Sequence, residues 1–130
     1  MRFLLDTHIL LWSLNTPERL PRPLREQLES PATEVWFSAA SIWEIAIKSA
    51  LGKISFCYPP EQIAEAARKT GFMEIPVSST HAAGVARLAM HHHDPFDRLL
   101  IAQALEMPAR FVTADAALAV YSGMIELVEK

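Results

Sequence analysis

The amino-acid sequence predicts an α/β fold in which a mostly parallel sheet lies between layers of helices. Short apolar runs, typical of buried strands, alternate along the chain with segments whose apolar residues recur at helical spacing. The 130 residues, 51% of them hydrophobic, suffice for one domain with a single packed core. The sequence has no internal repeat and no low-complexity tract. We therefore expect a single domain that spans residues 1–130.

The first half of the chain is expected to hold two strands, each followed by helix. The run RFLL ends at Asp6 and predicts the first strand; a mixed helical segment and the proline-spaced stretch TPERLPRPLREQLE come next. The bulky, partly alternating run EVWFSA, residues 34–39, predicts the second strand. Residues 38–52 repeat apolar side chains at helical spacing, and Gly52 is a natural helix end.

The second half continues the alternation of strand and helix. Its expected elements are a short helix between Pro59 and Gly71, a strand at residues 74–77 (EIPV), a helix within residues 78–90 behind Ser or Thr caps, a helix within residues 91–105 (HHHDPFDRLLIAQAL), and last strands at residues 109–115 (ARFVTAD) and 124–129 (MIELVE).

Four acidic residues are expected at the carboxyl edge of this sheet, where ligand sites of open parallel sheets lie. They are the residue that closes the first strand, one early in the helix after the second strand, one at the start of the helix in residues 91–105, and one after FVT: Asp6, Glu44, Asp97 and Asp115. Crowded carboxylates repel one another unless a cation neutralises them, and Mg²⁺ or Mn²⁺ suits an all-oxygen site. Such a metal would activate a water for attack on a phosphodiester.

The acid at the start of the last long helix also has a purely structural interpretation. With Asp94 as N-cap and Pro95 at the first helical position, Asp97 falls where an acidic side chain favours the helix dipole. Asp94 is therefore assigned to the cap, and to the site only as a supporting residue. Asp6 has no such explanation, because a carboxylate after an apolar strand risks burial without a basic partner nearby in sequence.

The other two acids have structural alternatives as well. Glu44 could complete a capping box with Ser41 or pair with Lys48 one turn later. Asp115 could be a loop residue or the N-cap of the segment AALAVYSG. Two threonines next to acids, Thr7 and Thr113, could hold carboxylates or metal-bound water through their hydroxyls, although threonines at strand ends are commonly structural.

The segments LLDTHILLW, SAASIWEIAIKSALGKI, HDPFDRLLIAQA and FVTAD, taken in this order and spacing, resemble the PIN-domain ribonucleases, especially the VapC-type toxins of bacterial toxin–antitoxin pairs. The resemblance covers nearly the whole chain and implies a PIN-like three-layer sandwich. It also implies metal-dependent endonucleolytic cleavage of RNA, a homodimer, and inhibition by a VapB-like antitoxin. By motif position, the family's acidic ligands fall on Asp6, Glu44, Asp97 and Asp115, the fourth being the least uniform in the family.

The charge balance agrees with a protein that binds RNA locally rather than over its whole surface. There are 12 basic and 15 acidic residues, a net charge of −3. Candidate contacts to the RNA backbone near the site are Lys48, Lys53 and Arg98, with Arg19, Arg22 and Arg25 in the proline-spaced stretch. The sequence does not say which RNA is cut.

The compartment is expected to be the cytoplasm. Cys57 has no partner in the chain, which excludes a disulfide framework and suits a reducing environment. No uncharged apolar run approaches the roughly 20 residues that a membrane span needs. Apolar residues in ILLWSL and IWEIAI offer modest support for an interface, or else belong to the core. A place in the core or at an interface, rather than stacking on RNA bases, is likewise expected for Trp12, Trp36 and Trp43.

Three other functions are less consistent with the sequence. A zinc site in HHHD with His8 is disfavoured, because consecutive side chains diverge and the usual ligand spacings are absent. A phosphorylation receiver domain would resemble a different pattern, with paired acids after the first strand and a lysine after the last, whereas this chain has a single Asp6 and TAD. A non-catalytic binding module of the same fold is the main alternative, although the presence of all four acids counts against it.

Overall fold

The computed structural model describes residues 1–89, 94–121 and 125–128. Strands and helices alternate in the order β1 Arg2–Leu5, α1 Thr7–Asn15, α2 Arg22–Glu29, β2 Glu34–Ser38, α3 Ala39–Ala50, α4 Pro60–Thr70, β3 Met73–Ile75, α5 Ser79–Gly84, α6 Pro95–Glu106, β4 Arg110–Thr113 and β5 Ile125–Leu127. Short 3₁₀ helices lie at η1 Pro17–Arg19, η2 Ile54–Phe56, η3 Val85–Arg87 and η4 Ala116–Tyr121. No helix in the described ranges is long and apolar enough to cross a membrane.

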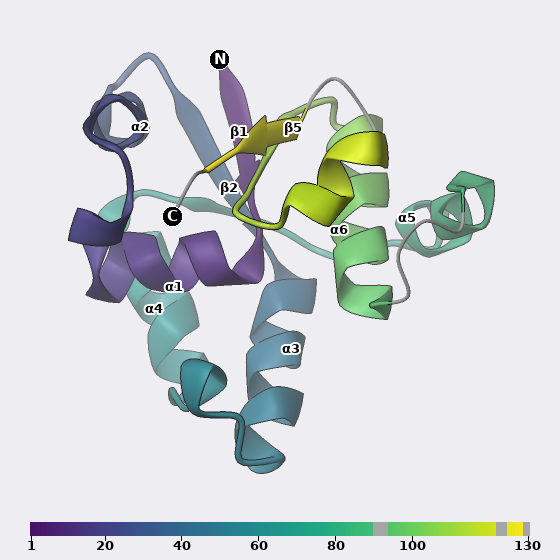
Figure 1. Cartoon of the computed structure of the whole chain (residues 1–130), viewed down its shortest axis with the longest axis horizontal. Helices are drawn as coiled ribbons and strands as arrows, with labels where there is room; N and C mark the ends of the chain where they lie inside the picture. Colours follow the sequence, from purple (N-terminus) through teal and green to yellow (C-terminus); the bar gives the residue numbers. More distant parts are fainter. Residues whose placement is uncertain (90–93, 122–124, 129–130) are drawn as a thin grey trace.

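The strands form one parallel sheet in the order β3-β2-β1-β4-β5. In the register of the central strand, Phe3 lies opposite Val35 of β2 and Arg110 of β4. Because β1 is central and all strands run the same way, their carboxyl ends meet at one edge, where α1, α3 and α6 begin (Figure 1).

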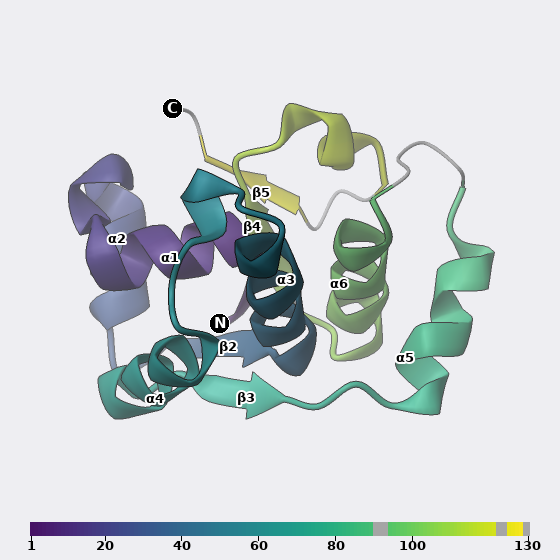
Figure 2. The same cartoon turned by 90° about the horizontal axis from the view of Figure 1, so that it is seen from below.

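Alternate residues of the central strands feed two apolar clusters, one on each face of the sheet. Phe3 and Leu5 pack in the cluster that contains α1, α4 and Leu24 of α2. Leu4 packs in the other cluster with residues of α6 and with Leu118 of η4. Figure 2 shows α1, α2 and α4 at one side of the molecule, α6 and α5 at the other, and α3 between them. The sheet, with one apolar cluster on each face, lies between layers of helices, which is the predicted three-layer arrangement.

Local sequence signals explain most helix boundaries. Asp94 caps α6 by accepting a hydrogen bond from the backbone N–H of Phe96 at 2.9 Å, as predicted. Gly71 and Gly52 have φ of 101° and 77°, a left-handed conformation that only glycine adopts readily, and they follow the ends of α4 and α3.

One expectation about an element needs correction, and one open alternative is decided. The third strand is observed at Met73–Ile75 rather than residues 74–77, because Pro76 has no N–H with which to continue the ladder. The residues of ILLWSL that were considered for an interface belong mainly to the core, since Ile9 through Trp12 are buried. The histidines of HHHD, residues 91–93, lie outside the described residues.

Candidate functional site

Asp6 lies at the carboxyl end of β1 and is the N-cap of α1. Its side chain accepts hydrogen bonds from the backbone N–H of Ile9, at 2.8 Å, and from the hydroxyl of Thr113 at the end of β4. Its own N–H donates to the carbonyl of Val112 at 2.9 Å, which ties the residue to the neighbouring strand. The residue is 6% exposed. The predicted burial of Asp6 is confirmed, and capping is a structural role that the sequence interpretation missed.

The environment of Asp6 disfavours its charged form. The pKa of this carboxyl is raised to about 7. Burial is the largest cause and the negative charges of Asp97 and Glu44 add to it, while the hydrogen bonds from Thr113 and Ile9 partly offset the rise. The two acids from α6 and α3 therefore act on the same carboxylate. The carboxylates of Asp97 and Glu44 thus lie near enough to that of Asp6 for their charges to affect it.

Glu44 comes from α3 and is 3% exposed. One carboxylate oxygen accepts a hydrogen bond from Thr7, whose hydroxyl also lies 3.0 Å from that of Ser41. The other oxygen accepts from the ammonium of Lys48, one helical turn later. The capping-box interpretation of Glu44 is wrong, because Ser38 caps α3 through the N–H of Ala40. The alternative pairing with Lys48 is confirmed.

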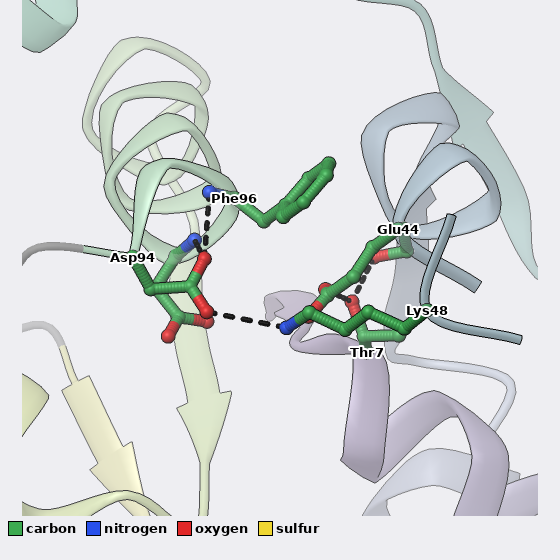
Figure 3. Close-up of polar contacts among 7 residues, drawn as sticks. Thr7, Glu44, Lys48, Asp94 and Phe96 are labelled. Carbon is green, nitrogen blue, oxygen red and sulfur yellow. Dashed lines mark hydrogen bonds and ion pairs between the residues drawn. The ribbon is translucent and has the colours of Figure 1, made fainter. Parts of the chain in front are cut away.

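Lys48 connects α3 with the start of α6. Its Nζ lies 2.5 Å from Glu44 and 3.2 Å from Asp94, and Figure 3 shows the side chain reaching from one helix to the other. Burial would lower the pKa of Lys48, but the hydrogen bond and charge of Glu44, together with Asp94, raise it overall, so the lysine is protonated. The sequence predicted the first contact from helical spacing, but not the second.

Asp115 lies after β4 and is exposed. Its backbone N–H donates to the Thr113 hydroxyl at 3.1 Å, and its side chain accepts from the N–H of Ala117 at 3.0 Å. The N-cap interpretation is therefore confirmed. Asp115 and Asp6 line the same cavity of about 490 Å³. The Thr113 hydroxyl thus contacts the carboxylate of Asp6 and the backbone N–H of Asp115.

The same cavity is lined on another side by His8, Trp12 and Arg19. The Arg19 guanidinium lies 4.1 Å from the centre of the Trp12 ring, a cation–π contact that fixes its position. The His8 ring lies 4.7 Å from that of Phe56. Asp6 caps a helix, so His8 is in the first turn of α1. An aspartate directly before apolar residues at helical spacing was the signal for this cap.

The proposed basic contacts differ in their surroundings. Arg98 is buried, and its guanidinium donates to the carbonyls of Ala89 and Val85 and to the hydroxyl of Tyr121. Its assignment as an RNA contact is wrong, because those groups take up its donors inside the fold. Lys53 is exposed, as an RNA contact requires.

The donor set suits a hard divalent cation, since carboxylate and hydroxyl oxygens converge at the edge of the sheet. A buried carboxyl such as Asp6, whose pKa is raised to about 7 close to two further negative charges, is the setting in which a bound cation would favour the charged form. Within residues 1–89, 94–121 and 125–128, however, no three His, Cys, Asp or Glu side chains are grouped to hold one ion together.

Comparison with known proteins gives a consistent result. The chain matches the PIN domain family over residues 3–123. Ribonuclease VapC22 of Mycobacterium tuberculosis is 33% identical over 116 residues, 86% of this chain and 85% of that protein.

Solved structures share the fold. A chain in the crystal structure of VapBC2 from Rickettsia felis, bound to a DNA fragment from its promoter, has a TM-score of 0.71 at 17% identity and covers 99% of this chain and 100% of its own. A domain of a functionally unknown protein from Methanocaldococcus jannaschii has a TM-score of 0.55 at 12% identity, covering 92% of this chain and 81% of that one. The predicted PIN-like α/β fold is confirmed.

Proposed function

This chain belongs to the PIN-domain family, and we propose that it is a metal-dependent endoribonuclease, the toxin of a toxin–antitoxin pair. The observation that carries the proposal is the position of Asp6. It is buried at the carboxyl edge of the sheet, under the negative charges of Asp97 and Glu44, and it opens onto a cavity that it shares with Asp115. The name of the relative VapC22 supports ribonuclease activity.

The four acids, Asp6, Glu44, Asp97 and Asp115, are proposed to hold Mg²⁺ or Mn²⁺. When bound, such an ion supplies neutralisation of phosphate charge and a lowered pKa for a water that attacks the phosphodiester. Thr113 orients the Asp6 carboxylate, and Thr7 orients that of Glu44. The N-terminus of α6, capped by Asp94, positions Asp97 at its first turn.

RNA is proposed to approach through the cavity next to the acids. Arg19 lies on its wall, fixed against Trp12, and offers a guanidinium to a backbone phosphate of the substrate. Lys53, exposed after α3, is a further candidate contact. Because these contacts displace counterions, RNA binding should weaken steeply as salt rises.

The partners proposed are a VapB-like antitoxin and a second copy of this chain. The structural relative comes from a VapBC2 complex, which supports an antitoxin. Crowded carboxylates at the site would attract a basic side chain of such an inhibitor. For the homodimer, Trp43 is 58% exposed on α3, and its ring meets that of Phe96 at the edge of the site. We further propose that residues 1–130 act as one domain in the cytoplasm.

The proposal is tested by incubating purified, partner-free protein with a panel of structured cellular RNAs in Mg²⁺, Mn²⁺ or EDTA. Asp6→Asn is run beside it, with Glu61→Gln, an exposed acid at the start of α4, as matched control. Cuts that need metal, persist in Glu61→Gln and disappear in Asp6→Asn support the nuclease. Folded protein that cuts no RNA with either metal favours the alternative, a non-catalytic PIN-like binding module.

A further inference from the structure

We infer that Lys48 supplies one of the positive charges of the acidic site, so that the site takes a single divalent ion, held on the side of Asp6. The inference rests on the proposed function and narrows its ligand set, because it assigns Glu44 and Asp94 to Lys48. We call Glu44, Lys48 and Asp94 the helix side of the site, and Asp6 with Thr113 the strand side.

The position of Lys48 is fixed by more than its two acidic partners. The side chain is 18% exposed, and its ammonium lies 4.8 Å from the centre of the Phe56 ring and 5.5 Å from that of Phe96. These ring faces favour a cation between them. The lysine also starts from the same helix as Glu44, one turn away, so the pair forms without any movement of the backbone.

The carboxylates of the helix side already receive donors on every oxygen. Glu44 accepts from Thr7 on one oxygen and Lys48 on the other. Asp94 accepts the backbone N–H groups of Phe96 and Asp97 on one oxygen, and Lys48 on the other. A metal ion here would meet, at short range, the positive charge of an ammonium that already makes two ion pairs.

The strand side differs in the charge of its donors. Among the described residues, the hydrogen bonds to the Asp6 carboxylate come from a backbone N–H and a hydroxyl, both neutral. Asp6 remains close to the charges of Asp97 and Glu44. The strand side therefore has negative charge left for a metal ion to neutralise. On the helix side, the ammonium of Lys48 already provides the cation.

The test is the number of Mn²⁺ ions bound per chain, measured by isothermal titration calorimetry and by electron paramagnetic resonance in the absence of RNA. Wild-type protein should bind one ion. Lys48→Met, which keeps the length of the side chain and removes its charge, should bind two, with the spin coupling of a close Mn²⁺ pair. Lys48→Arg, which keeps the charge, and Lys53→Met, which removes an exposed lysine nearby, should bind one.

The outcomes separate this inference from the proposed function. Two ions in wild-type protein, or one ion of unchanged affinity in both wild type and Lys48→Met, would overturn the role of Lys48 and leave the metal-dependent nuclease standing. No ion in any of the proteins would instead overturn the metal dependence of the proposed function. Two ions in wild-type protein would overturn the inference even where Lys48→Met fails to fold.

Discussion

The two sides of the acidic site differ in how the negative charge of a buried carboxylate is compensated. On the strand side, Asp6 is buried among neutral donors, and its pKa is raised to about 7. On the helix side, Glu44 is equally buried but is paired with a protonated lysine, which Asp94 also contacts. The comparison teaches that burial alone does not mark a ligand site. What marks it is a buried carboxylate whose charge the protein leaves uncompensated.

The comparison is tested most strongly by the pH dependence of stability in EDTA. The pKa of Asp6 rises from 3.8 to about 7 on folding, so the folded protein binds more protons than the unfolded chain between these values. The contribution of Asp6 to stability is therefore full below about pH 4 and is lost as the pH rises to about 7. Asp6→Asn should remove this loss and be more stable than wild type at about pH 8, by up to about 4 kcal/mol.

This difference is measured by urea unfolding of both proteins in EDTA at about pH 5 and about pH 8. Asparagine keeps an acceptor for the N–H of Ile9, so the cap of α1 survives. Added Mn²⁺ should stabilise wild type and leave Asp6→Asn unchanged. Equal stability of the two proteins at every pH would show that the charge of Asp6 is compensated after all.

On the helix side, removing a charge should have the opposite effect on stability. Lys48→Met leaves the buried carboxylate of Glu44 without its cation and should destabilise the metal-free protein by about 2 kcal/mol, below the usual cost for a buried pair because Lys48 keeps some contact with solvent. Lys53→Met, which changes an exposed lysine, should stay within about 0.5 kcal/mol of wild type. Thermal or urea unfolding in EDTA measures both. A Lys48→Met protein that is more stable than wild type would show that both sides gain stability when a charge is removed.

Local features of the site were predictable from sequence, whereas contacts between distant segments were not. Asp94 as N-cap follows from its place before Pro95, and the Glu44–Lys48 pair follows from helical spacing. The second contact of Lys48, with a residue 46 positions later, depends on how α3 packs beside α6. Likewise, Arg98 has the sequence context of an exposed helix residue, and only the folded chain brings carbonyls from residues 85 and 89 to it.

A smaller effect is expected from the threonines that serve the two sides. Thr113→Val removes a hydrogen bond from Asp6 and should cost about 1.5 kcal/mol, while Thr7→Val should cost about 1 kcal/mol because Glu44 keeps Lys48. The hydrogen bond from Thr113 lowers the pKa of Asp6, so Thr113→Val should raise that pKa further. Carboxyl ¹³C chemical shifts followed against pH measure this. An unchanged Asp6 titration would contradict the proposed orienting role of Thr113.

The smallest effect is expected where RNA meets the cavity beside the strand side. Arg19→Ala should weaken RNA binding a few-fold and reduce the slope of log affinity against log salt by about 0.7, the value for one phosphate contact on a single strand. Binding of a fluorescent single-stranded RNA to Asp6→Asn protein in EDTA isolates this contact from cleavage. Arg22→Ala is the matched control, because Arg22 is exposed and pairs with Glu26 on α2 rather than lining the cavity. Equal losses for the two arginines would indicate a diffuse attraction to RNA. A loss confined to Arg19→Ala would mean that Arg19, held against Trp12 beside the acids, guides a phosphate of the RNA toward Asp6.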